Sequence, residues 1–198
     1  RIGKACYIPI GHNSKKCIDI DIVIKKLKPL LEDPSIKKIG QNIKFDFIVL
    51  FKNGINITSM EDTMLMSYVL DAGKNRHNMD TLSEIHLGHK TISFKDLVGS
   101  GKKEINFSEV DIEKAKDYAA EDADITYRLY KKFYKSLKEE KMVNIYEIFE
   151  KPMIKLLLET AYGGLTDTST LAFATQSGYK LRVVINNTIV YTNDSISI

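Results

Sequence analysis

The sequence predicts an α/β fold, in which short strands alternate with amphipathic helices. Three segments have the composition of strands, at residues 4–12, 37–41 and 55–60, and the first of them alternates and is rich in Ile and Tyr. Around them, apolar residues recur every three or four positions, which indicates helices packed against a sheet. The 198 residues are 43% apolar and 28% charged, as in an ordinary globular protein with a sizeable core.

Two helices are expected in the first half of the chain. One follows Asp21, a favoured N-cap residue, and ends before Pro34. Its apolar stripe is Val23, Leu27, Leu30 and Leu31. The other is the segment NIKFDFIVLFKNG, which is apolar nearly all round and therefore buried on several sides, with Asn53-Gly54 closing it. Pro9 favours an edge position for the first strand, because proline has no N–H for a central ladder.

Four more helices are predicted in the second half. Asp62 caps the segment TMLMSYVL, and Gly88 ends the helix of NMDTLSEIHLGHK. A polar loop at 90–110 leads to a long helix from Asp111 towards residue 141, and a last helix at 143–159 is kinked by Pro152. Beyond it, residues 161–198 contain four charged residues and ten Ser or Thr. We therefore expect one domain at 1–159 and a divergent tail at 160–198, with a β-hairpin about Asn186-Asn187.

Composition narrows the class of protein. A net charge of +3 forces no large basic field, and no run of about 18 apolar residues predicts a membrane span. Cys6 and Cys17 form neither a C-x-x-C nor a zinc pattern, so we expect reduced thiols in a cytoplasmic protein. Lysine outnumbers arginine by 25 to 4, which makes Arg76 conspicuous.

The segment KDYAAEDADITYRLY places carboxylates on two different faces of the long helix. Most of them share a solvated face with Arg128 and Lys131, where ion pairs one turn apart are expected: Asp117, Glu121 and Asp124. Asp122 instead interrupts an apolar stripe that includes Tyr118 and Ile125. A carboxylate aimed at a core costs several kcal/mol unless it is paired or binds a metal. It could be satisfied by backbone donors or a lysine, or it could serve a site.

Asp46 repeats this pattern on another helix, with Ile43, Val49 and Leu50 at the neighbouring turn positions. Two inward-facing carboxylates on separate helices have the form of a site for a divalent cation with oxygen ligands. Their separation in sequence is not diagnostic, since only the fold could bring them together.

Residues 4–158 resemble the 3′–5′ proofreading exonuclease domain of bacterial family A DNA polymerases, in the ribonuclease H-like DEDD superfamily. GQNIKFD is similar to the second exonuclease motif of that family, and YAAEDADIT to the third, Tyr-x-x-x-Asp. EDTMLMSYVL, RHNMDTLSE and HKTISFKDLVGSGK resemble the linking segments in order and spacing. The resemblance implies a ribonuclease H-like mixed sheet flanked by helices, lacking its first two strands.

The resemblance also implies two-metal hydrolysis of DNA 3′ ends, in which four carboxylates hold two Mg²⁺ or Mn²⁺ ions that lie about 4 Å apart. It assigns metal-ligand roles to Asp46 and Asp122, and orientation of the attacking water to Tyr118. Contacts to a single-stranded or frayed 3′ end carry over to Gln41, Asn42, Lys44, Phe45, Arg76 and Phe94. Arg76 would bind a phosphate and Phe94 would stack on a terminal base. The plainer interpretations are a surface ion pair for Arg76 and a loop anchor for Phe94.

Two other patterns carry no site prediction. His77, His86 and His89 lack a cysteine or further clustered ligand, so we expect surface residues rather than zinc ligands. GSGKK, at residues 99–103, lacks the full spacing and the Ser or Thr of a phosphate-binding P-loop.

The first motif of the family, Asp-x-Glu on the first strand, does not occur before KACYIPI, so we expect an N-terminally truncated domain with no polymerase domain. Two carboxylates alone hold Mg²⁺ poorly, and negligible hydrolysis is expected. The missing strands would leave a sheet edge exposed, unless the tail is an extension that pairs with it. The sequence therefore supports two hypotheses, an exonuclease domain or a catalytically inactive module that binds DNA 3′ ends or acts as a scaffold.

Overall fold

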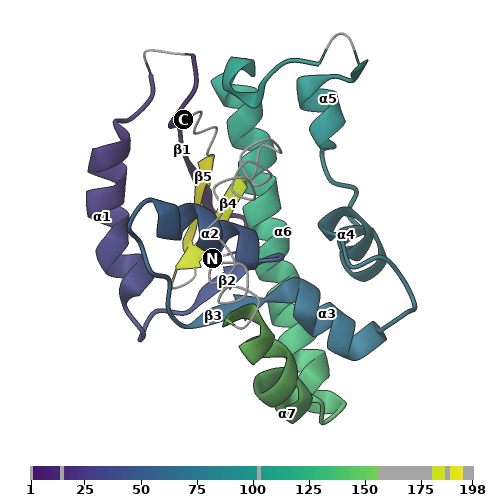
Figure 1. Ribbon diagram of the computed structural model, residues 1–198. Coiled ribbons are helices and arrows are strands. Elements are labelled where there is room, and N and C mark those ends of the chain that lie inside the picture. Colours follow the sequence, from purple (N-terminus) through teal and green to yellow (C-terminus); the bar gives the residue numbers. More distant parts are fainter. Residues whose placement is uncertain (1, 14–15, 102–103, 156–179, 186–187, 194–198) are drawn as a thin grey trace.

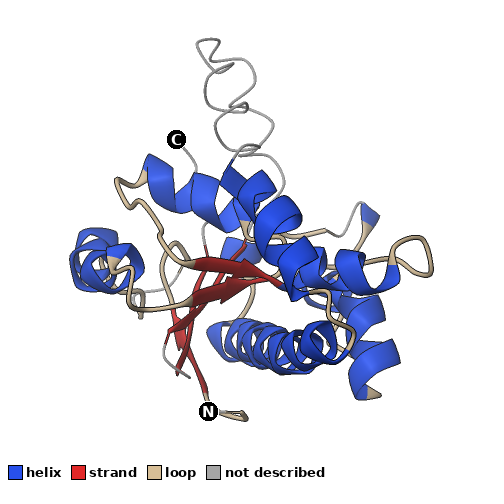
Figure 2. Ribbon diagram, turned by 90° about the horizontal axis from the view of Figure 1, so that it is seen from below, coloured by secondary structure: helices blue, strands red, loops and turns tan. Residues whose placement is uncertain are grey.

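The computed structural model describes residues 2–13, 16–101, 104–155, 180–185 and 188–193, the last two ranges by their backbone course. Its strands form one sheet with helices on both faces (Figures 1 and 2). The strands are β1 (Ala5–Ile8), β2 (Lys38–Gly40), β3 (Met60–Asp62), β4 (Lys180–Ile185) and β5 (Thr188–Asn193). The predicted mixed α/β architecture is confirmed.

The helices agree with the predicted order, with one addition in the loop at 90–110. They are α1 (Ile20–Glu32), α2 (Lys44–Lys52), α3 (Thr63–Asp71), α4 (Met79–Leu87), α5 (Phe94–Val98), α6 (Ile112–Glu139) and α7 (Val143–Ile145). A 3₁₀ turn, η2 (Phe107–Glu109), precedes α6, and a π-helical turn, η3 (Tyr146–Glu150), continues α7. The polar composition at 90–110 hid α5, whose start is marked by Ser93 accepting from the N–H of Lys95.

The sheet order is β1-β5-β4-β2-β3, so the two C-terminal strands lie between β1 and β2. β4 and β5 pair antiparallel, β5 runs parallel to β1, and β4 runs antiparallel to β2. The edges of β1 and β2 that we expected to be exposed are therefore paired with another strand. β1 lies at one border of the sheet, as Pro9 directly after it predicted.

The main core lies where α6 packs along the sheet and against α3 and α4 (Figure 1). Ile39 of β2 contributes to this cluster, together with α6 residues such as Ala119 and Phe133. A second cluster joins α1, through Val23 and Leu31, to the segment after α2. These contacts fix α6 against the sheet, which decides where Asp122 lies.

Several boundaries differ from the prediction. Asp19, not Asp21, caps α1 by accepting from the N–H groups of residues 21 and 22. Leu30 is 40% exposed, so the buried stripe of α1 is narrower than expected. The segment 55–60 belongs to a strand only at Met60, and its buried residues Ile55 and Ile57 lie in irregular backbone. β1 covers four residues of the predicted strand at 4–12.

Other local predictions are confirmed by the cap geometry. Asp62 caps α3, Asp111 caps α6, and Gly88 ends α4 with a left-handed φ of 62°. Near Pro152 the helix has a π turn in which the N–H of Lys151 donates to the carbonyl of Tyr146. Proline has no N–H to continue the α-helical pattern, which accounts for the widened turn just before it.

Candidate active site

Asp122 is buried in the middle of α6, where it is 1% exposed. The helix begins at Asp111, whose carboxylate accepts from the N–H groups of residues 113 and 114, and its apolar stripe packs against the sheet. Ala119 and Ala123 flank Asp122 and are themselves fully buried. The carboxylate therefore belongs to the inner face of α6, as its position in the stripe predicted.

Tyr118 lies one turn before Asp122 and is also buried. Its ring belongs to an aromatic cluster with Phe94, the first residue of α5, and Phe107. The ring centroids of Phe94 and Phe107 are 6.0 Å apart and nearly parallel, and that of Tyr118 is 6.3 Å from Phe94. The fold thus brings together two of the predicted site residues, Tyr118 and Phe94, from separate helices.

Asp46 lies in the first turn of α2 and is 4% exposed. α2 follows a tight turn after β2, in which Asn42 has a positive φ of 61°. Gly40 is required before this turn, because a Cβ there would lie 2.8 Å from the side chain of Ile43. Both α2 and α6 contact β4, so the helices that carry Asp46 and Asp122 meet the same strand.

Gln41 forms a structural tie with both ends of its amide. Its Nε2 donates to the carbonyl of His77 at 2.8 Å, and its Oε1 accepts from the hydroxyl of Thr63. The next site candidates, Lys44 and Phe45, are both half-buried at the start of α2, and the ammonium of Lys44 lies 5.3 Å from the ring centroid of Phe45. Gln41 therefore links the turn before α2 to the segment that carries Arg76.

Arg76 is exposed in the loop between α3 and α4, and it forms no ion pair with any residue of the described ranges. The neighbouring His77 is fixed, since its Nδ1 lies 2.9 Å from the hydroxyl of Ser67. The surface ion pair considered for Arg76 is thus not formed with the described residues, and its guanidinium faces solvent beside a well-fixed backbone.

The face of α6 that was predicted to be solvated is only partly so, because the side chains of Glu121 and Asp124 are 18% and 15% exposed. Arg128 Nε pairs with Asp124 Oδ2 at 2.6 Å. Glu121 has a further use, because its oxygens accept from the N–H of Ile92 and contact the Nε2 of His89, both at the loop that leads to α5. Glu121 therefore holds the chain two residues before Phe94, whereas Asp124 pairs with Arg128.

Metal ligands are incomplete in the part of the chain that the structure describes. No group of three or more His, Cys, Asp or Glu side chains there could hold a metal ion. Asp46 and Asp122 are oxygen donors of the kind that Mg²⁺ and Mn²⁺ prefer. Two carboxylates are too few to form a complete site for either ion.

The three histidines of the central region differ in exposure. His89 is exposed, as expected of a surface residue, whereas His77 and His86 are half-buried. The ring of His86 lies edge-on to Phe133, with the centroids 4.8 Å apart, and burial lowers its pKa below the ordinary value. The rings of His77 and His86 therefore take part in packing. The sequence did not indicate this, because neither histidine belongs to an apolar periodic pattern.

Two further buried acids near the site, Glu61 and Asp62 at the end of β3, were not predicted as site residues. Glu61 forms ion pairs with Lys37 and Lys151 at 3.0 and 2.9 Å. Asp62 was expected to cap α3, but its carboxylate also reaches the turn before α2. In the sequence, the two acids stand out only as consecutive carboxylates at the end of a predicted strand. Nothing nearby in the sequence indicates that Asp62 also accepts from the turn before α2.

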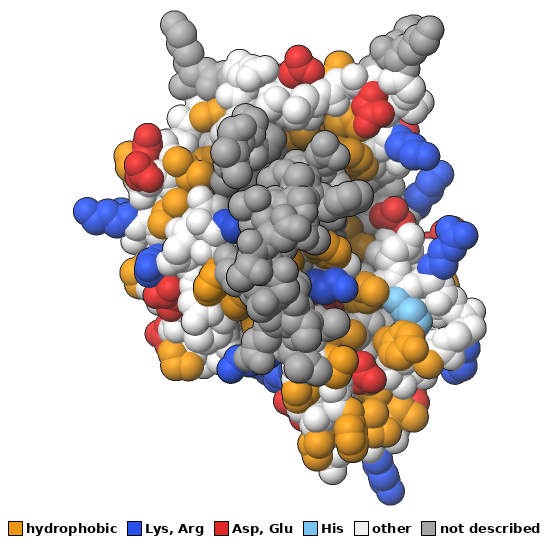
Figure 3. Space-filling view, viewed as in Figure 1, with side chains coloured by type: hydrophobic (Ala, Val, Ile, Leu, Met, Phe, Trp, Pro, Cys, Tyr) orange, Lys and Arg blue, Asp and Glu red, His pale blue; other side chains and the backbone are white. Residues whose placement is uncertain are grey.

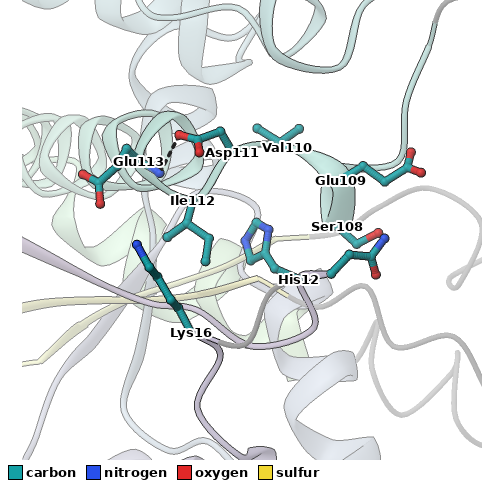
Figure 4. Close-up of a pocket in the computed structure, with 9 residues that line it drawn as sticks. His12, Lys16, Ser108, Glu109, Val110, Asp111, Ile112 and Glu113 are labelled. Carbon is teal, nitrogen blue, oxygen red and sulfur yellow. Dashed lines mark hydrogen bonds between the residues drawn. The ribbon is translucent and has the colours of Figure 1, made fainter.

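A pocket of about 250 Å³ lies between the segment after β1 and the start of α6 (Figure 4). His12, after β1, and Asp111, at the start of α6, both line it. The Nε2 of His12 contacts the hydroxyl of Tyr7, and its ring lies 5.7 Å from that of Phe107. The lining residues include neither Asp46 nor Asp122, so the pocket is not part of the candidate site.

The surface shows where other contacts could form. Lys and Arg side chains lie scattered over the described part of the face in Figure 3, without a single basic stripe. Apolar side chains gather near α7 and η3, where Ile148 and Phe149 are 61% and 67% exposed. None of the helices in the described part of the chain combines the length and the apolar composition that crossing a membrane requires.

Comparison of the sequence with known proteins places the chain in a family. A family model described as 3′–5′ exonuclease matches residues 2–138. DNA polymerase I of Rhizobium leguminosarum is 41% identical over 174 residues, which is 82% of this chain and 17% of the relative. DNA polymerase I of Pseudomonas aeruginosa is 40% identical over 85% of this chain and 19% of its own length, and that of Borreliella burgdorferi is 38% identical over 80% and 17%. The chain spans less than a fifth of the length of these relatives.

Proposed function

Because this chain belongs to the 3′–5′ exonuclease domain family of bacterial DNA polymerase I, we propose that its site binds the 3′ end of single-stranded or frayed DNA. The observation that carries the proposal is the buried Asp122, one helical turn after a buried Tyr118 that lies beside Phe94. The aromatic rings beside it can stack on a base, and the carboxylate could approach the phosphates of a polynucleotide end through a bound divalent cation.

Each predicted residue has a role in this proposal. Phe94 stacks on the terminal base, and Arg76 donates to a phosphate from its exposed position. Lys44 and Phe45, at the start of α2, contact the next nucleotide, while Asn42 shapes the turn that presents them. Gln41 acts indirectly, because its amide holds the backbone beside Arg76.

We further propose that the complete site hydrolyses the bound 3′ end. Asp46 and Asp122 would each give carboxylate oxygens to Mg²⁺ or Mn²⁺, which in a complete site supplies an activated water and stabilises the leaving 3′ oxygen. The Tyr118 hydroxyl would orient that water. The described residues do not by themselves make a complete metal site, so we expect negligible hydrolysis from these 198 residues.

The second candidate function is binding of a DNA 3′ end without cleavage, and the sheet order favours it. β4 contacts both α2 and α6, and its sequence, KLRVVI, contains no acidic residue. The strand that meets both aspartate-bearing helices therefore adds no carboxylate to Asp46 and Asp122. Contacts of an arginine with phosphate and of an aromatic ring with a base need no metal ion, so binding could persist where hydrolysis fails.

The test is a fluorescence anisotropy and gel assay with the 198-residue chain and an end-labelled single-stranded oligonucleotide, with and without Mn²⁺. We expect binding that prefers a free single-stranded 3′ end over a blunt duplex, with little shortening. Arg76→Ala should weaken binding about tenfold, as for loss of a charged hydrogen bond, and lower the salt slope by roughly 0.7 for one phosphate.

Two aspartate variants separate binding from hydrolysis. Any shortening should disappear in Asp122→Asn and persist in the matched control Asp117→Asn, whose side chain is exposed on the same helix. Shortening that survives Asp122→Asn would remove the catalytic assignment. Equal affinity for ends and blunt duplexes, unchanged by Arg76→Ala, would overturn the proposed function.

A further inference from the structure

Asp62 is a buried carboxylate close to the candidate site that no proposed step uses. It ends β3, is 3% exposed, and occupies the N-cap position of α3, where Oδ1 accepts from the N–H of Met64 at 2.9 Å. A third buried acid near Asp46 could be taken for a further metal ligand. Its hydrogen bonds indicate a different role.

Both oxygens of Asp62 accept from the backbone of the turn that precedes α2. Oδ1 accepts from the N–H of Asn42 at 2.9 Å, and Oδ2 accepts from the N–H of Ile43 at 3.0 Å. Together with the bond from Met64, the carboxylate satisfies three backbone donors from two different segments. Backbone N–H groups that point at one carboxylate occupy the lone pairs that a cation would need.

The turn needs this support, because it contains a conformation that is costly on its own. Asn42 has a φ of 61°, in the left-handed region, which costs of the order of 1 kcal/mol for a residue other than glycine. Ile43 is the N-cap residue of α2 and cannot cap it with a side chain. Asp62 therefore supplies from another strand the acceptor that the start of α2 lacks.

Thr63 holds the other side of the same turn. Its hydroxyl donates to the carbonyl of Gly40 at 3.1 Å and lies against Oε1 of Gln41. The junction of β3 and α3 thus fixes the chain from Gly40 to Ile43, and Asp46 follows within the first turn of α2. A shift of this turn would move Asp46 together with the neighbouring residues of α2.

We propose that Asp62 is a positioning residue, which caps two helices at once and holds the turn that orients Asp46 and the DNA-contacting residues of α2. The effect on DNA binding rests on the proposed function, whereas the capping by Asp62 does not depend on it. Asp62 binds neither the cation nor the nucleic acid. Its effect on both passes through the backbone of Asn42 and Ile43.

The experiment uses Asp62→Asn in the 198-residue chain, with amide hydrogen exchange and 3′-end binding as readouts. Asparagine has the same shape but places an NH₂ against one of the backbone donors. The amides of Asn42 and Ile43 should exchange about tenfold faster, and affinity for a single-stranded 3′ end should fall by a similar factor. The matched control is Asp19→Asn, which changes the cap of α1 in the same way and should leave both readouts unchanged.

A second substitution distinguishes positioning from direct ligation. Glycine adopts a positive φ without strain, so Asn42→Gly in the Asp62→Asn background should restore most of the slow exchange at Ile43 and most of the binding. If the carboxylate itself bound a cation or the DNA, glycine at position 42 could not replace it. Failure of the rescue in a folded double variant would therefore overturn the proposal. If exchange responds as expected but the parent chain binds no 3′ end, the capping role stands and the proposed function fails.

Discussion

Glu61 joins three parts of the molecule through one buried side chain. It pairs with Lys37, next to β2, and with Lys151, after η3, and its Oε2 accepts from the hydroxyl of Tyr146 at 2.9 Å. That hydroxyl in turn accepts from the N–H of Asp62. Burial, together with the charge of Glu61, raises the pKa of the Tyr146 hydroxyl far above its ordinary value, so the phenol remains a donor to Glu61.

At this scale we predict that Glu61→Gln lowers the free energy of unfolding by about 2 kcal/mol, because charged hydrogen bonds to two lysines and a tyrosine are weakened. The effect stays below that of a fully buried pair, since Lys37 is 46% exposed and can turn to water. Urea unfolding followed by circular dichroism measures it. Glu139→Gln, in an exposed pair with Lys135, is the control and should change stability by less than about 0.5 kcal/mol. Equal effects of the two substitutions would contradict the network.

Among the elements, α1 has a proline in its last turns. Pro29 lies on the exposed side of the helix, three residues before its end, and cannot donate to the carbonyl one turn earlier. The buried stripe of Val23, Leu27 and Leu31 holds the helix against the second core cluster despite this. Tertiary packing therefore overrides a local preference that would stop the helix.

We predict that Pro29→Ala stabilises the protein by roughly 1–2 kcal/mol. The restored hydrogen bond and better helix propensity exceed the entropy that the unfolded chain regains without proline. Thermal unfolding measures the change, and Lys26→Ala, on the exposed face of α1, serves as the control, expected within about 0.5 kcal/mol of the parent. A destabilised Pro29→Ala protein would mean that the ring makes contacts the helix depends on.

For the whole molecule, the sheet depends on strands from both ends of the chain. β5 and β4 lie between β1 and β2, so the N-terminal strand joins the remaining sheet through the C-terminal hairpin (Figure 1). Pairing between segments so far apart in sequence is slow to form, because the loop-closure entropy is lost before the strands can pair.

Removing the hairpin therefore has a specific expected result. A chain of residues 1–155 should expose the edges of β1 and β2, and we expect self-association with faster amide exchange at Ile39, whose partner on β4 is Val184. Light scattering and hydrogen exchange measure the two effects. A monomeric 1–155 chain with unchanged protection at Ile39 would show that β2 does not depend on β4.

The order and type of most elements could be predicted from the sequence, since they depend on signals that act within one or two helical turns. Asp111 and Gly88 mark helix ends by their own hydrogen bonds and φ, and Asp122 is buried because α6 has one apolar face. The family could be predicted because its motifs follow one another in order along the chain. The roles of the site residues in DNA binding and hydrolysis stay predictions.

The tertiary structure decided what no local pattern contains. The capping of α2 by Asp62 joins residues 19 and 20 positions apart, and the insertion of β4 and β5 beside β1 and β2 joins the two ends of the chain. Hydrogen bonds of this kind depend on where separate elements meet in space. Periodicity and capping signals report only the environment along one element, so the contacts of Asp62 with the turn before α2 and the order of the strands could be learned only from the fold.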